Sequence, residues 1–247
     1  MFTVLTQNLR IDVASDREND WNHRKPLVER LLADYAADIL AFQGVLVHQR
    51  RDLIAMLSGF AWTGRGREPG GEGEGCYVFW NTNRFQALEQ ETFYLAPDPL
   101  QSGLAWDAAC PRICNRVVLK AEELPPIQLY NVHLDHIGKV ARRKSVDMVR
   151  ARMQQSEQPA VLLGDFNEQQ AFDHFPSLAG LQDAFAVHGS DNEGTFHGFT
   201  GLAKGSPIDY ILTSPNIGVE FCQRLSDGWE GRYPSDHFGL LAGLELA

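Results

Sequence analysis

The sequence predicts an α/β fold in which two mixed β-sheets pack together and carry helices on their outer faces. Short apolar runs typical of strands outnumber the segments with helical periodicity. Some consecutive strand-like runs are separated by a helix and others only by a turn. Two packed mixed sheets with outer helices are the simplest architecture that accommodates both kinds of connection.

The expected strands are apolar runs bounded by glycine, proline or polar residues. They cover residues 3–8, 38–43, 76–80, 84–94, 113–120, 127–134, 160–163, 208–213, 218–225 and 238–246. Helices are expected at 25–36, 45–57 and 139–155, the first because Leu27, Leu31 and Tyr35 recur at helical spacing. Residues 64–75 include six glycines and are expected to form a loop that borders a site.

Size and composition favour a single domain that spans residues 1–247. The chain is 44% hydrophobic and 10% aromatic, which is enough to form a sizeable core. Its longest apolar runs are far shorter than the roughly 20 residues that cross a bilayer. Residues 1–10 lack the charged and apolar pattern of a secretory signal. We therefore expect a cytoplasmic, monomeric protein with no membrane segment.

The net charge of -10 argues against a protein that binds long nucleic acids, since such binding needs many clustered lysines and arginines. Compact substrates are favoured instead. Residues 139–152 are a basic exception, for which a solvated helix face is the favoured interpretation. The cysteines have no paired CxxC spacing, so we expect buried thiols.

Polar clusters follow several of the apolar runs. They are GDFN with Asp165 and Asn167, NVHLDH with His133 and His136, and SDH with Asp236 and His237. Loops that leave rigid strand ends commonly carry ligands, so these side chains can converge although they are far apart in sequence. Aspartate, asparagine and histidine together suit Mg or Mn better than structural zinc. A site for Mg or Mn is therefore expected.

This inventory suits the hydrolysis of a phosphate ester, which needs an activated water and positive charge near the phosphoryl oxygens. We expect His237 to take a proton from the water. Asp209, inside the apolar IDYIL segment, is of the right type to fix the tautomer of His237. Asp236 is then available to bind the metal.

The remaining polar residues are assigned to the water and the phosphate. We expect Asp165 and Asn167 to orient the water and a phosphoryl oxygen, and His133 and Arg112 to offer positive charge. Each cluster alone is compatible with an ordinary turn, but their joint appearance in this order favours a site. A structural role is an open alternative for three further substrate-binding candidates, His136, His197 and Trp106.

The chain resembles the endonuclease/exonuclease/phosphatase superfamily in an ordered set of motifs: QNLR, FQG, PRI, NVHLDH, GDFN, GTFHGF, IDYIL and RYPSDHFGL. The resemblance spans nearly the whole chain and is greatest to a bacterial subgroup. It implies a four-layer α/β sandwich and Mg-dependent cleavage of a phosphoester. The family pattern further implies metal contacts by Asn8 and Asp236, phosphate contacts by His133 and Asn167, nucleophile placement by Asp165, and orientation of the base His237 by Asp209.

Gly44 departs from the family pattern, which places a metal-binding glutamate after the glutamine of FQG. Glycine has no side chain that coordinates a cation, so one anionic ligand is missing. Three explanations are open. The first is an engineered or accidental substitution in an otherwise active enzyme. The second is a natural variant that binds metal through Asp236, Asn8 and substrate oxygens, with Glu74 or another nearby carboxylate as a further ligand, and the third is a homologue that binds a phosphorylated ligand without turnover. Replacing Gly44 by glutamate is accordingly expected to raise Mg-dependent activity.

The sequence thus predicts a Mg- or Mn-dependent phosphodiesterase or phosphatase. Its substrate is expected to be a small or single-stranded phosphate ester, a nucleotide or single-stranded nucleic acid included. One rival is a DNA-repair-type endonuclease, which would need a basic face that the net charge disfavours. The other is a catalytically impaired phosphate-binding homologue. The motifs do not select the leaving group, because loops around a site usually do so.

Overall fold

A computed structural model describes residues 1–188 and 194–246 of the chain. Two six-stranded sheets dominate it, with strand orders β11-β12-β1-β2-β4-β3 and β5-β6-β7-β8-β10-β9. The first sheet comprises β1 (Phe2–Asn8), β2 (Ile39–Val45), β3 (Phe60–Gly66), β4 (Gly75–Asn81), β11 (Ile217–Leu225) and β12 (Gly239–Leu246). The second comprises β5 (Gln86–Tyr94), β6 (Ile113–Lys120), β7 (Ile127–His133), β8 (Ala160–Asp165), β9 (Gln182–Asp183) and β10 (Asp209–Thr213).

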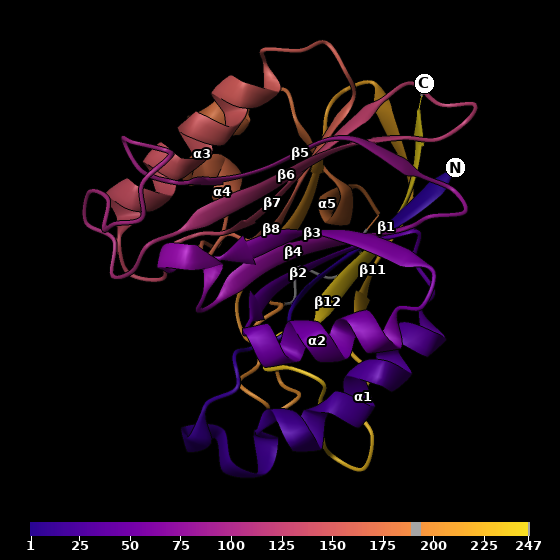
Figure 1. Ribbon diagram of the computed structural model, residues 1–247, viewed down its shortest axis with the longest axis vertical. Helices are drawn as coiled ribbons and strands as arrows, with labels where there is room; N and C mark the ends of the chain where they lie inside the picture. Colours follow the sequence, from indigo (N-terminus) through magenta and orange to yellow (C-terminus); the bar gives the residue numbers. More distant parts are fainter. Residues whose placement is uncertain (189–193, 247) are drawn as a thin grey trace.

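Helices cover the outer faces of the two sheets (Figure 1). The first sheet carries α1 (Trp21–Asp34) and α2 (Val47–Met56), and the second carries α3 (Lys139–Met153) and the short α4 (Ala171–His174). The remaining helical segments are α5 (Ala184–His188) and the 3-10 turns Ala14–Asn19, Pro69–Gly71 and Pro176–Leu178. The predicted α/β sandwich with two packed mixed sheets is therefore confirmed.

Each sheet contains one parallel pair among antiparallel neighbours. In the first sheet β1 and β2 are parallel, and in the second β7 and β8 are parallel. Both pairs are joined through a helix, α1 in one case and α3 in the other. Parallel strands need such a crossover, and their carboxyl ends then meet at the same edge of the sheet. This arrangement brings the ends of β1, β7 and β8 to one side of the molecule.

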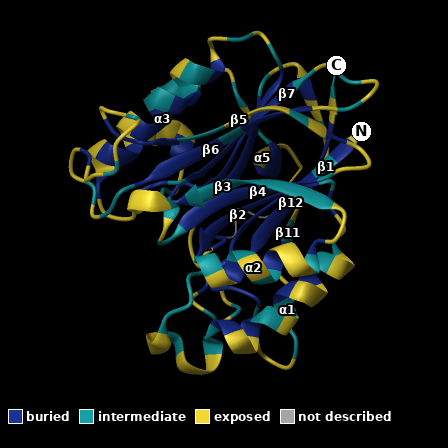
Figure 2. Cartoon of the chain, viewed as in Figure 1, coloured by how far each residue is buried: buried dark blue, intermediate teal, exposed yellow. Residues whose placement is uncertain are grey.

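The strands of both sheets are largely buried (Figure 2), and the main apolar clusters form one layer between the sheets and one on each outer side. Val4 and Leu163 belong to the cluster between the two sheets, whereas their chain neighbours Leu5 and Leu162 face the outer helices. On the outer side, Leu5 shares a cluster with Leu31 of α1. Because successive strand residues point to opposite faces, strands that are buried on both sides appear as continuous apolar runs.

Within the segment 64–75, residues 67–74 form the expected loop, while residues 64–66 and Gly75 belong to strands. β3 continues through Gly66 and β4 starts at Gly75, so the two strands form a hairpin with a short 3-10 turn between them. Gly64 has φ +129°, and a Cβ there would lie 2.2 Å from the carbonyl oxygen of Cys76. The glycine thus permits a close approach of the two strands rather than breaking the first one.

The cysteines follow the expectation of buried thiols except for Cys110. Of the cysteines, Cys76, Cys114 and Cys222 are buried and Cys110 is half-buried, all as free thiols. Within residues 1–188 and 194–246, no helix combines the length and the apolar character needed to cross a membrane.

Candidate active site

The predicted polar clusters converge at one edge of the two packed sheets. β7 and β8 place His133 directly beside Asp165, and β10 places Asp209 on the other side of Asp165. Asn8 ends β1, and His237 precedes β12 on the facing sheet. A cavity of about 440 Å³ is lined by Asn8, His133, Asp165 and His237, whereas Asp209 is not among its lining residues. Strand register and sheet packing therefore assemble residues that are more than 200 positions apart in the chain.

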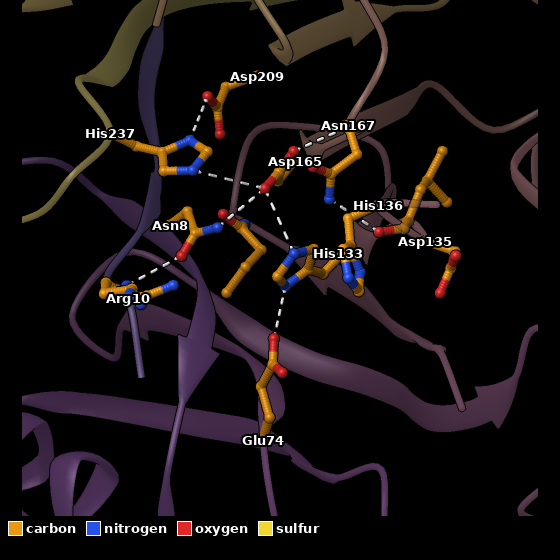
Figure 3. Close-up of polar contacts among 12 residues, drawn as sticks. Asn8, Arg10, Glu74, His133, Asp135, His136, Asp165, Asn167, Asp209 and His237 are labelled. Carbon is orange, nitrogen blue, oxygen red and sulfur yellow. Dashed lines mark hydrogen bonds and ion pairs between the residues drawn. The ribbon is translucent and has the colours of Figure 1, made fainter. Parts of the chain in front are cut away.

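Asp165 is the centre of this cluster, as Figure 3 shows. Its Oδ2 accepts a hydrogen bond from Asn8 Nδ2 at 2.8 Å and lies 3.3 Å from His133 Nε2 and 3.9 Å from His237 Nε2. Its Oδ1 accepts from the backbone N–H of Asn167 at 2.8 Å. Only 1% of Asp165 is exposed. A buried carboxylate surrounded by donors is held in a defined orientation toward the cavity.

His237 forms a buried pair with Asp209. Its Nδ1 lies 2.9 Å from Asp209 Oδ2, while its Nε2 points toward Asp165. Burial lowers the pKa of His237, but the negative charges of Asp209, Asp165 and Asp236 outweigh burial and raise it to about 10. Desolvation by burial raises the pKa of Asp209, against the opposing effect of the nearby imidazole. The surrounding carboxylates therefore favour the protonated form of His237.

This preference gives His237 a second possible role beside the expected removal of a proton from water. The protonated ring donates a hydrogen bond to an anion, whereas the neutral ring takes a proton from water. The carboxylate of Asp165 is the group beside His237 that can accept one. The expected pairing of Asp209 with His237 is present in the structure. Asp209 orients the imidazole whether His237 acts as a base or as a hydrogen-bond donor.

Glu74 is a functional candidate that sequence reasoning placed elsewhere. The sequence suggests it only as a replacement metal ligand, but it lies directly before β4 beside His133 and two arginines. Its carboxylate oxygens are 2.8 Å from His133 Nδ1, 2.6 Å from Arg67 Nη1 and 3.5 Å from Arg112 Nη1. Burial raises the pKa of Glu74, but His133, Arg112 and Arg67 more than reverse this and lower it. Glu74 therefore orients positive groups toward the cavity.

We call Asp165, Asn167, His133, Glu74 and His237 the phosphate end of the cavity, and Gly44, Asn8, Arg10 and Asp236 the Gly44 end. Asn167, with φ +49°, donates from Nδ2 to the carbonyl oxygen of Leu134 and lines the cavity. Arg112 and His136 also line it, 3.3 Å apart between Nη2 and Nδ1. Both ends thus border the same space.

The Gly44 end offers few ligands for a divalent cation. Asp236 is its carboxylate, and the guanidinium Nε of Arg10 lies 3.8 Å from Asp236 Oδ2. The side-chain oxygen of Asn8 already accepts from the backbone N–H of Arg10 at 2.9 Å. A Cβ at Gly44 would lie 2.4 Å from that oxygen, and Gly44 has φ +65°. One carboxylate and an engaged amide oxygen fit Mg or Mn poorly, because these ions prefer more anionic oxygen ligands.

A second group of side chains meets the spatial requirement for a cation. Ligand atoms of Asp165, Asp209 and His237 all lie within 4.8 Å of one another, so this group could hold a divalent ion. A metal would bind the neutral imidazole of His237, whereas the surrounding carboxylates favour the protonated ring.

Two substrate-binding candidates lie outside the residues that line the cavity. His197 is buried and stacks on Phe238 with ring centroids 4.0 Å apart, and its Nδ1 accepts from the backbone N–H of Gly201. Burial, reinforced by the charge of His237, lowers the pKa of His197 to about 4, so this ring is neutral. Trp106 is 39% exposed with φ +55° and does not line the cavity. The structure gives His197 a packing role.

Comparison with known proteins places this geometry in a family. The model of the Endonuclease/Exonuclease/phosphatase family matches residues 5–237. No curated protein matches the chain. Among solved structures, an endonuclease/exonuclease/phosphatase family protein from Bacteroides thetaiotaomicron is 33% identical, with a TM-score of 0.92 over 98% of this chain and 97% of that one.

Two further solved structures show how far the similarity extends. A mannosyl-6-phosphatase from Bacteroides thetaiotaomicron is 31% identical, with a TM-score of 0.92 over 100% of both chains. D. rerio TDP2, solved in complex with a single strand DNA product, is 15% identical with a TM-score of 0.80 over 99% of this chain and 98% of that one, and it shows a shared fold alone. The chain belongs to the Endonuclease/Exonuclease/phosphatase family.

Proposed function

We propose that the chain hydrolyses compact phosphate esters in the cavity around Asp165. The arrangement of Asp165 carries this proposal: a buried carboxylate faces two histidines and an asparagine amide at the wall of a cavity of about 440 Å³. Ligand pockets for small molecules have volumes of roughly 300–1,000 Å³. A carboxylate beside several donors can hold a water and an anionic oxygen next to each other.

The proposed reaction is the attack of water on phosphorus. Asp165 orients the water and takes its proton, a bond forms between the water oxygen and phosphorus, and the ester oxygen leaves with the electrons of the broken bond. The leaving oxygen then takes a proton from solvent. Protonated His237 donates a hydrogen bond to a phosphoryl oxygen, and Asn167 holds a second one. No step is assigned to a divalent cation, because the Gly44 end offers a poor ligand set.

His133 and Arg112 supply further positive charge beside the phosphoryl group. Glu74 contacts both residues, so it fixes where their charge is presented. Cationic groups that are already in place stabilise negative charge on the transferred phosphoryl group without reorganisation during the reaction. In this mechanism Glu74 therefore acts through its neighbours rather than on the substrate.

The proposed substrate is a small ester such as a sugar phosphate or a nucleotide. The cavity volume and the net charge of -10 both disfavour long duplex DNA, and the full-length similarity to a mannosyl-6-phosphatase favours a sugar phosphate. Nothing at the site favours the rival DNA-repair endonuclease, and the buried Asp209–His237 pair argues against a merely binding homologue.

A substrate panel tests the proposed function. We expect phosphate release from mannose 6-phosphate or a nucleotide to exceed cleavage of duplex DNA, with and without added Mg or Mn. The variant His237→Ala serves as the inactive control. Exclusive cleavage of duplex DNA would support the repair endonuclease instead, and absence of turnover on every ester would support the binding homologue.

A further inference from the structure

The Gly44 end has a cation of its own, the guanidinium of Arg10. This side chain lines the same cavity as Asp165, His133 and His237, and its Nε lies 3.8 Å from Asp236 Oδ2. Gly44 contributes no side chain, so no carboxylate from that position competes for Arg10. A guanidinium that is paired with Asp16 and Asp236 therefore borders the cavity at the Gly44 end.

Arg10 is held in place by contacts to both its backbone and its side chain. Its φ of +55° lies in the left-handed region, which a residue with a side chain rarely adopts. Asn8 accepts from its N–H, while Arg24 Nη2 and Gln49 Nε2 each donate to its carbonyl oxygen at 3.0 Å. Strained backbone that the surroundings hold so fully is concentrated at functional sites.

The contact with Asp16 orients the guanidinium. Arg10 Nε and Nη2 donate to the two carboxylate oxygens of Asp16 at 2.9 and 3.0 Å. Among residues 1–188 and 194–246, none is hydrogen-bonded to Nη1. The side chain is 37% exposed, so part of it remains open to a ligand. A bidentate pair on one edge leaves the other edge of the planar group available to an anion.

We propose that Arg10 is a catalytic residue that binds a phosphoryl oxygen and supplies the positive charge which the incomplete metal site cannot hold. The proposal rests on the proposed function, since it assigns a role within that same cavity. Arginine suits this role because its planar fork matches phosphate oxygens and its charge persists at every relevant pH. Its consequence is that hydrolysis continues after divalent cations are removed.

Steady-state kinetics of EDTA-treated protein test the proposal. We expect wild-type kcat to change by less than about threefold on EDTA treatment, and Arg10→Ala to lose about 100-fold or more, as when one transition-state donor is removed. Arg10→Lys should lie between them because it keeps the charge but loses the fork. Arg17→Ala, which removes an exposed arginine from the same segment, is the matched control and should retain wild-type kcat.

Two further measurements separate a chemical role from a structural one. Added guanidinium ion should restore part of the activity of Arg10→Ala, and inorganic phosphate should bind the EDTA-treated wild type more tightly than this variant in a calorimetric titration. Activity that disappears with EDTA, returns with Mg or Mn and survives Arg10→Ala would overturn the proposal while upholding phosphoester hydrolysis. If no ester is hydrolysed at all, the proposed function fails. Equal binding of inorganic phosphate by wild type and Arg10→Ala would overturn the role of Arg10 alone.

Discussion

The two ends of the cavity differ in how many side chains secure each functional group. At the phosphate end, Asp165 lies among Asn8, His133 and His237, and Glu74 contacts His133 in turn. At the Gly44 end, Asp236 faces the guanidinium of Arg10, which Asp16 holds, and Gly44 supplies no ligand. A network of contacts loses its geometry when one member changes. The comparison predicts which substitutions cost most.

The largest effect is expected for His237→Ala. This variant removes the protonated donor and leaves Asp209 buried without its partner, so kcat should fall by about 1,000-fold, within the range for one proton-handling group. Steady-state kinetics on a small phosphate ester measure the loss, and circular dichroism confirms the fold. His23→Ala, at an exposed histidine on α1, is the control. A loss of less than about tenfold would remove His237 from the chemistry.

Glu74→Gln comes next, because it tests whether the phosphate end depends on a residue that contacts only other side chains. The amide keeps the shape but loses the charge that orients His133, Arg67 and Arg112, so kcat should fall by about 100-fold. KM should rise less than kcat falls. Glu72→Gln, at an exposed position of the same hairpin, should behave as wild type. Equal loss in both variants would point to damage of the hairpin instead.

The phosphate end could be predicted from sequence because its residues lie in short motifs at strand ends. Asp165 and Asn167 follow an apolar run directly, and Asp209 begins one. Strand order alone then brings these motifs together. The two sheets could be predicted equally well, because strands that are buried on both faces appear as long apolar runs in the sequence. The resemblance of these motifs to a family supplied the remaining roles.

The Gly44 end was harder to predict from the sequence, because its contacts do not follow from the pattern of neighbouring residues. Arg24 lies on a helix, where an exposed arginine is ordinary, yet it is 1% exposed and donates to the backbone at Leu9, Arg10 and Pro234. These backbone contacts of Arg24 have no signal within a short window of sequence.

Substitutions at Gly44 are expected to cause moderate losses of stability and of kcat. The structure reverses the expectation that Gly44→Glu raises activity, because any Cβ collides with the side-chain oxygen of Asn8 and the backbone φ is +65°. Gly44→Ala and Gly44→Glu should both lose stability by about 1–3 kcal/mol. Both should also lose about tenfold in kcat, since Asn8 is displaced from Asp165.

Urea unfolding and a Mg titration measure these two effects. Gly44→Ala is the matched control for Gly44→Glu, because it introduces the Cβ without a carboxylate. A Gly44→Glu variant that is more active than Gly44→Ala only when Mg is added would show that the missing ligand still matters. Equal kinetics for the two variants at every Mg concentration would show that sterics alone control the position.

The smallest effect, a change of stability with pH, distinguishes the two buried histidines. The pKa of His237 is raised from 6.5 to about 10, so the folded state binds the proton more tightly than the unfolded state. Its stabilising contribution is complete below pH 6.5 and disappears as the pH rises toward 10. The pKa of His197 is lowered to about 4, so its contribution is present above pH 6.5 and disappears as the pH falls toward 4.

Urea unfolding of wild type, His237→Gln and His197→Gln at several pH values between 4 and 10 checks this difference. The stability gap between wild type and His237→Gln should shrink from pH 6.5 to 10, while the gap for His197→Gln should shrink from pH 6.5 to 4. A His237 gap that stays constant to pH 10 would show that the imidazole is neutral throughout. His237 would then be free to act as the base, and Asp165 would return to orienting the water alone.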